Sequence, residues 1–321
     1  MGRFAFVIAL PSLPLLGYWL SGASRMGMEP DRPVSSHLQP QPRITGFPAV
    51  DVPTVDEPRR GPSPFSLEAL KDRSSRWTFT RMETPRWRLV LTERFAVRSD
   101  LVMDDLRYAG ACLEEAYSAL EGILGGGTGD LRFSARIFRS RDAFTRYAGC
   151  LGVKDAVSFY DPATYEIVAF RDEGAGRERL GVALFHETAH IYIHRVFGRT
   201  GPLWLTEGVA EYVSRFRVSA GRVRVGEDDP AARTALKAAL DRGTWIPLLE
   251  LLEMVREAFY GPRYAQAYAQ SWLLIRTLLP AKSESFPDIL RPLLDGFPLS
   301  STRRPELVEE QMRALATAGS G

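Results

Sequence analysis

The sequence predicts an α+β fold, in which a small mixed sheet with helices is followed by a mostly helical lobe. Apolar and polar residues alternate from Trp77 to Leu91 and again from Leu131 to Phe138, as in half-buried strands. Between these strands, residues 100–124 carry apolar side chains at helical spacing. We therefore expect an α/β lobe over residues 75–175 and a helical lobe over residues 176–318.

The N-terminus has the composition of a targeting segment. Residues 1–3 bring a positive charge, residues 4–20 are apolar but contain two prolines, and residues 21–23 are small. The apolar run is short for a membrane-spanning helix. We expect a signal peptide over residues 1–23, with an uncleaved N-terminal anchor as the alternative, and hence an exported protein that could associate with a membrane or the cell envelope.

The next segment, residues 24–74, is rich in proline and has little apolar periodicity. Such a segment buries too little surface to offset the entropy lost on ordering. The sequence predicts a disordered or extended tether here, leading into one domain over residues 75–321.

Composition limits the classes of function. The chain of 321 residues is 45% hydrophobic and 25% charged, which is typical of a globular protein. A net charge of +2 gives no argument for a nucleic-acid partner. Cys112 and Cys150 could form a disulfide after export or remain separate thiols, and the sequence leaves both open.

Further elements follow from local patterns. Residues 156–160 and 165–170 flank an Asp-Pro turn and predict a hairpin. Other segments have the spacing and end signals of helices: residues 141–149, 230–240, 247–258, 263–279 and 305–318.

The segment LGVALFHETAHIYIHR, residues 180–195, contains the pattern HExxH. On a helix, His186 and His190 lie one turn apart on the same face, where both imidazoles can bind one Zn²⁺ ion, with Glu187 beside them as a general base. Glu187 is also the one charged residue from Leu180 to Ile193. A buried carboxylate needs compensation, which a metal site supplies. The alternative is a buried helix whose histidines bond to the backbone.

A second motif, WLTEGVAEY at residues 204–212, offers two carboxylates one turn apart, Glu207 and Glu211. A catalytic zinc site needs three protein ligands and an open position. Sixteen residues separate His190 from Glu207, which is enough for a helix end, a turn and a returning helix. Either carboxylate could be the third ligand on spacing alone.

Together, HETAH and WLTEGVAEY resemble the gluzincin metallopeptidases, and more closely an uncharacterised family of bacterial zincin-like proteins. The motifs cover residues 180–213. The resemblance implies a zincin-like fold and a zinc peptidase acting on peptides or proteins, in which His186, His190 and Glu207 bind the metal and Glu187 is the base. It also implies that Glu211 bonds a ligand histidine.

The same resemblance implies two further features. Tyr268, or Tyr264, would stabilise the oxyanion of the tetrahedral intermediate. The strand before the metal-binding helix, residues 165–170, would be a sheet edge that pairs with a peptide, with an internal strand as the alternative. His194 lies too far along the helix from His186 to share its ion, so we expect a structural role. A catalytically inactive zinc-containing module that binds peptides or the envelope is the competing function.

Overall fold

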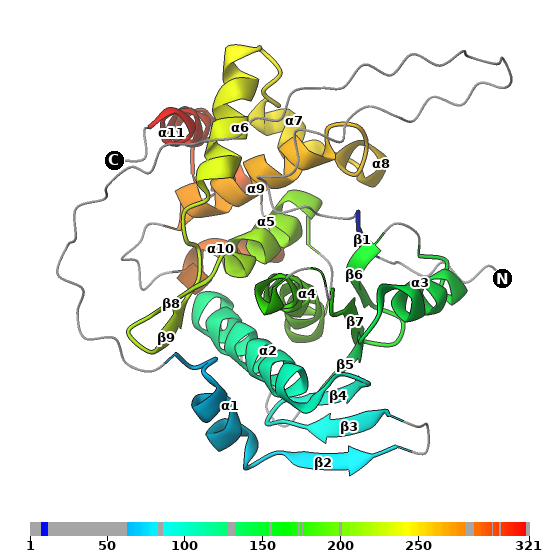
Figure 1. Cartoon of the computed structure of the whole chain (residues 1–321). Coiled ribbons are helices and arrows are strands. Elements are labelled where there is room, and N and C mark those ends of the chain that lie inside the picture. Colours follow the sequence, from blue (N-terminus) through cyan, green and yellow to red (C-terminus); the bar gives the residue numbers. More distant parts are fainter. Residues whose placement is uncertain are drawn as a thin grey trace, which may run out of the picture.

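The computed structural model describes residues 8–11, 63–82, 86–126, 132–153, 156–172, 174, 176–198, 201–279, 286–296, 298–301 and 303–318. In this part of the chain, seven strands form a mixed sheet in the order β1-β6-β7-β5-β4-β3-β2, and the end strand β1 pairs antiparallel with β6 (Figure 1). The strands of the sheet are β1 (Ile8–Pro11), β2 (Thr78–Arg81), β3 (Arg88–Leu91), β4 (Phe95–Ser99), β5 (Phe133–Phe138), β6 (Ala156–Asp161) and β7 (Glu166–Phe170). A separate hairpin joins β8 (Arg217–Ser219) and β9 (Arg222–Arg224).

The centre of the sheet is parallel, since β5 pairs with both β4 and β7 in that sense, while the flanking pairs are antiparallel. In β5, the buried residues Phe133, Ala135 and Ile137 alternate with the half-buried Ser134 and Arg136. This is the period of a strand that turns one face toward a hydrophobic core.

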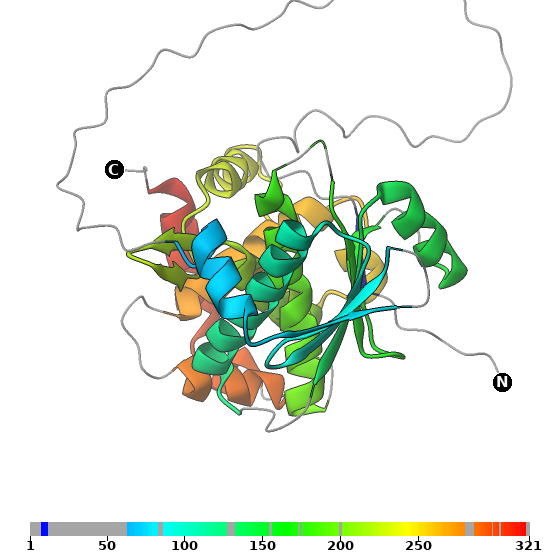
Figure 2. The ribbon, with the colours of Figure 1, turned by 60° about the horizontal axis from the view of Figure 1, so that its bottom comes forward.

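The helices are α1 (Leu67–Ser74), α2 (Met103–Leu124), α3 (Arg141–Cys150), α4 (Arg177–Phe197), α5 (Leu203–Ser214), α6 (Pro230–Asp241), α7 (Leu248–Glu253), α8 (Arg256–Phe259), α9 (Tyr264–Leu278), α10 (Phe286–Leu294) and α11 (Pro305–Thr317). Helices α2 and α4 cover one face of the sheet and α3 covers the other (Figure 2). Helix α4 also packs against α5, and α5 packs against α9. The helix with the HExxH pattern therefore lies between the sheet and the helical lobe.

The buried position of α4 follows from its sequence. Residues 184–193 of this helix are all buried, so the helix is covered on every side over nearly three turns. A helix that is apolar on all sides is stable only when other elements surround it. The sheet, α2 and α5 surround α4.

The structure confirms the α+β class and the hairpin at residues 156–170, where β6 and β7 pair antiparallel. Two boundaries were wrong. The predicted tether to residue 74 contains α1, because Ser66 caps this helix by accepting from Ala69 N and Leu70 is fully buried. The predicted helix 247–258 is two helices, α7 and α8, separated at Met254 and Val255.

Of the two alternatives for residues 165–170, the structure contradicts the sheet edge and shows the internal strand. Strand β7 pairs with β5 on one side and β6 on the other, so it lies inside the sheet. All five residues of β7 are buried, as an internal strand requires. On this side of the sheet β7 is followed by β6, and β1 is the end strand.

Cys112 is buried and Cys150 is exposed, and both thiols are free, so the structure does not contain the disulfide that the sequence left open. The expected signal peptide, apart from residues 8–11, and the tether up to residue 62 lie outside the described residues.

No described helix combines the length and the apolar character needed to cross a membrane.

Gly208 lets α5 and α9 approach each other closely. A Cβ atom at this position would lie 2.7 Å from both the Ser271 carbonyl oxygen and the Ile275 Cγ1 atom. Both distances are shorter than real Cβ atoms show, and one contact is with backbone. The adjacent residue is Glu207, so this contact also fixes a candidate site residue relative to α9.

We predict that Gly208→Ala lowers the free energy of unfolding by about 1–3 kcal/mol, because the added methyl group overpacks the contact between helices. Gly122→Ala is the control, since a Cβ atom at Gly122 in α2 meets nothing within 4 Å. It should raise stability by up to ~1 kcal/mol through helix propensity. Urea denaturation measures both, and an unchanged midpoint for Gly208→Ala would contradict this account of the helix contact.

Candidate metal centre

Two neighbouring helices provide the charged side chains of the site. Helix α4 carries His186, Glu187 and His190, and α5 carries Glu207 and Glu211. All five side chains are buried, with exposures of 0–5%. Helix α4 ends at Phe197 and is capped by Gly198, whose left-handed conformation (φ 69°) allows the chain to leave the helix before α5 begins.

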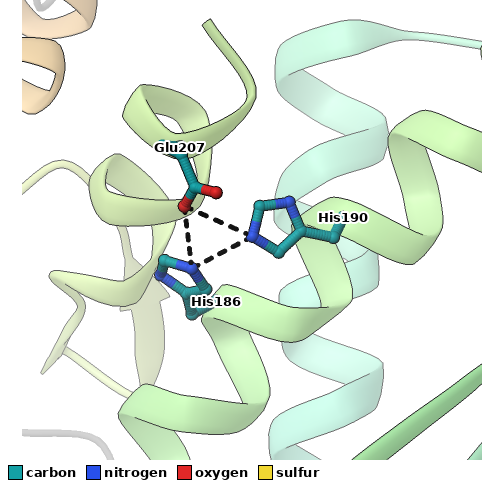
Figure 3. Close-up of side chains that lie close together, drawn as sticks. All are labelled: His186, His190 and Glu207. Atoms are coloured by element: carbon teal, nitrogen blue, oxygen red, sulfur yellow. Dashed lines mark hydrogen bonds and ion pairs between the residues drawn. The ribbon is translucent and has the colours of Figure 1, made fainter. Parts of the chain in front are cut away.

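The side chains of His186, His190 and Glu207 converge on one point (Figure 3). The two Nε2 atoms are 3.1 Å apart, and Glu207 Oε2 lies 3.4 Å from that of His186 and 3.5 Å from that of His190. Glu207 Oε2 is buried and makes no hydrogen bond of good geometry within the described part of the chain. These residues could hold a metal ion.

The second carboxylate of α5 lies behind His186. Glu211 Oε1 is 3.2 Å from His186 Nδ1, the ring nitrogen that faces away from Glu207. Its other oxygen accepts a hydrogen bond of 2.5 Å from Arg215. The structure thus places Glu207, and not Glu211, with the two Nε2 atoms, and Glu211 in the supporting position.

The Glu207 carboxylate has a partner that the sequence analysis did not identify. The Tyr260 hydroxyl donates a hydrogen bond of 2.6 Å to Glu207 Oε1. With Oε1 held by Tyr260, Oε2 faces the two histidines. Tyr260 follows α8 directly, and no sequence pattern links it to a residue 53 positions earlier.

Glu187 points toward the sheet. Its Oε1 atom accepts a hydrogen bond of 2.8 Å from Ser158 in β6, and its Oε2 atom has no hydrogen-bond partner among the described residues. One carboxylate oxygen is therefore held in place and the other is available. Ser158 was also missed at the level of sequence, because the contact depends on how β6 packs against α4.

Tyr268 from α9 lies on another side of the site. Its ring stacks against that of His186 with centroids 6.4 Å apart, and its buried hydroxyl has no partner of good geometry within the described residues. Tyr264 is half-buried one turn earlier on α9, and the ring contact with His186 identifies Tyr268 as the tyrosine beside the site.

His194 belongs to a different cluster. Its Nδ1 atom lies 2.7 Å from the Tyr160 hydroxyl, and its ring stacks on that of Tyr165 at 5.1 Å. These contacts tie the end of α4 to the β6–β7 hairpin, as expected of a structural histidine. Trp204 and Tyr212 are core residues.

Burial and close charges shift the pKa values of the site in opposite directions. Burial disfavours the charged form of His186, but the carboxylates of Glu207 and Glu211 raise its pKa to about 10. Although burial favours the neutral acid, the imidazoles hold the pKa of Glu207 well below its usual range. Burial also favours the neutral form of Glu211, but Arg215 and His186 lower the pKa of this carboxyl group to about 2.

Glu187 shifts the other way, because burial raises its pKa more than the nearby imidazoles and Ser158 lower it. Burial, reinforced by Glu207, also raises the pKa of Tyr268 well above 10, so its phenol stays a hydrogen-bond donor at neutral pH. The site therefore combines two ionised carboxylates, one more basic carboxylate and one protonated phenol.

We predict that Tyr260→Phe lowers the free energy of unfolding of the metal-free protein by about 1–3 kcal/mol, because Glu207 Oε1 loses its donor while buried. Tyr165→Phe is the matched control: this residue is 38% exposed and its ring stacks on His194, so we expect a change within about 0.5 kcal/mol. Urea denaturation of the two variants gives the comparison, and equal stability of both would remove Tyr260 from the site.

No protein-family model matches the chain, and no curated protein matches its sequence.

Proposed function

We propose that the chain is a zinc-dependent peptidase that hydrolyses peptide bonds with an activated water molecule. The observation that carries this proposal is the convergence of His186, His190 and Glu207, with their ligand atoms within 4.8 Å of one another, beside Glu187 with one unpartnered oxygen. The resemblance of HETAH and WLTEGVAEY to the gluzincin metallopeptidases supports the same conclusion.

The donor atoms favour zinc among the common metal ions. Two imidazoles and one carboxylate with room for a further ligand are typical of catalytic zinc, while calcium and magnesium prefer oxygen ligands. With zinc–ligand bonds of about 2.0–2.1 Å, the ligand atoms of a tetrahedral ion lie about 3.3–3.4 Å apart. The three separations in this site are 3.1, 3.4 and 3.5 Å.

When bound, zinc supplies Lewis acidity and lowers the pKa of a bound water molecule to about 7. Glu187 accepts a proton from the attacking water molecule while the water oxygen bonds to the carbonyl carbon of the peptide. It then delivers this proton to the leaving amine as the carbon–nitrogen bond breaks. The raised pKa of Glu187 suits both transfers at neutral pH. Ser158 holds the other oxygen of Glu187 and so fixes the direction of the base.

Tyr268 is the candidate donor to the developing oxyanion, since its buried hydroxyl is protonated and without a partner of good geometry in the described structure. The peptide would pair with β6, the strand that carries Ser158, in the place that β1 takes at the end of the sheet. The extended segment Ile8–Pro11 pairs antiparallel with β6 there, which supports the edge as a place for an extended chain.

The proposed substrate is a peptide or protein outside the cytoplasm. The argument for export is the basic, then apolar, then small-residue order of residues 1–23. Either a cleaved signal or an uncleaved anchor would bring the domain to the same side of the membrane.

We predict that the zinc-loaded protein cleaves members of a mixed peptide library, detected by mass spectrometry. Glu187→Gln should lower the rate by about 10²–10⁴-fold, because general acid–base catalysis is lost, while zinc content stays unchanged. Glu178→Gln, an exposed glutamate on the same helix, should retain full activity.

Cleavage by Glu187→Gln at the wild-type rate would remove Glu187 from the reaction. A fully metallated wild type that cleaves no peptide would favour the alternative function, an inactive zinc-containing binding module.

The two carboxylates of α5 give a separate prediction. Glu207→Ala should abolish stoichiometric zinc binding near neutral pH, because it removes a ligand. Glu211→Ala should weaken zinc affinity by about 10–100-fold, because it removes only the partner of His186. Equilibrium dialysis with elemental analysis measures both, and the reverse order would make Glu211 the third ligand.

A further inference from the structure

Arg215, the first residue after α5, contacts the site from behind. One guanidinium nitrogen donates to Glu211 Oε2 at 2.5 Å and to the Glu211 carbonyl oxygen at 2.8 Å. The Nε atom donates to Asp229 Oδ2 at 3.0 Å. The guanidinium also lies over the ring of Trp272, 4.9 Å from its centroid.

These contacts leave little freedom for Glu211. Arg215 takes one carboxylate oxygen and His186 Nδ1 lies by the other, so rotation of the carboxylate would break a contact on each side. Glu211 is 5% exposed, and without Arg215 its charge would be buried with no guanidinium beside it. An uncompensated buried carboxylate is costly, so the side chain would turn away to reach water or another donor.

The orientation of Glu211 determines what His186 can offer. A carboxylate at Nδ1 keeps the proton on that nitrogen and leaves the lone pair on Nε2. Nε2 is the atom that faces His190 and Glu207. The position of the Arg215 side chain therefore bears on metal binding although Arg215 does not reach the ligand atoms.

Arg215 also connects the site to α6. Asp229 caps that helix by accepting from Ala232 N at 2.9 Å, and the same side chain accepts from Arg215. The ligand helix α4 is thus linked through Glu211 and Arg215 to the start of α6.

We propose that Arg215 is a positioning residue for metal binding, which acts through Glu211 to hold the His186 imidazole with Nε2 toward the ion. This inference rests on the metal site of the proposed function. It makes no use of the peptidase reaction, so it can be tested by metal binding alone.

Arg276 provides a matched control. Its guanidinium lies over the same Trp272 ring, 5.7 Å from the centroid, but its hydrogen bond goes to the Gly226 carbonyl oxygen and its ion pair to Asp228. Replacing either arginine by methionine removes a cation from Trp272, and replacing Arg215 also removes the partner of Glu211.

The test is a double-mutant cycle on the full chain with Arg215→Met, Glu211→Gln and both together, plus Arg276→Met. Zinc affinity is measured by competition with a chromogenic chelator, and the visible absorption of bound Co²⁺ reports ligand geometry. We expect Arg215→Met to weaken zinc binding by about 10–100-fold and to alter the Co²⁺ spectrum. The zinc affinity of Arg276→Met should stay within about twofold of that of the wild type. In the Glu211→Gln background, Arg215→Met should change zinc affinity by no more than about twofold, because the effects of two residues that act as a unit are not additive.

Arg215→Lys keeps the charge with fewer fixed donors, so it should restore part of the lost affinity. It also replaces Arg215→Met in the cycle if the latter does not fold, which urea denaturation of the metal-free proteins shows. Wild-type affinity in Arg215→Met, or an equal loss with and without Glu211, would overturn the proposal. A wild type that binds neither Zn²⁺ nor Co²⁺ would overturn the metal site itself, whereas zinc binding without peptide cleavage would overturn only the peptidase.

Discussion

The structure depends on the compensation of buried negative charge where α4 meets α5. Glu187, Glu207 and Glu211 are 0–5% exposed. Within the described part of the chain, Arg215 bonds to Glu211, and its guanidinium also bonds to Asp229. Burying several carboxylates without positive charge costs far more than a marginally stable domain can tolerate. Protonated histidine meets part of this need, as the raised pKa of His186 indicates. A divalent cation at the convergence of the ligand atoms would meet the rest.

The fold brings a different supporting group to each side of this charge cluster. The sheet contributes Ser158, which holds Glu187, and the helical lobe contributes Tyr260, which holds Glu207. Gly208 allows α9 to approach α5, and α9 carries Tyr268 to the ring of His186. Since each of these groups comes from a different element, the site requires both lobes to be packed. Supporting hydrogen bonds of this kind keep metal ligands in one orientation.

The sequence predicted the parts of the site that depend on local periodicity. The i and i+4 spacing placed His186 and His190 on one face of a helix. Spacing alone left both Glu207 and Glu211 open as the third ligand, and the structure brings Glu207 to the two Nε2 atoms and Glu211 behind His186. It missed Ser158, Tyr260 and Arg215 as parts of the site: tertiary packing sets the first two contacts, and the side-chain orientation at the end of α5 sets the third. It also left open whether β7 is an edge strand or an internal one. Alternation identifies a strand, but the order of strands depends on pairing between distant segments.

The most direct test of the central claim is anomalous scattering at the zinc absorption edge, from crystals grown with one equivalent of zinc. The account predicts one strong peak about 2.0–2.2 Å from His186 Nε2, His190 Nε2 and Glu207 Oε2, with Glu211 still bonded to His186 Nδ1. The absence of a peak at this position, or a peak with Glu207 turned away from it, would contradict the account.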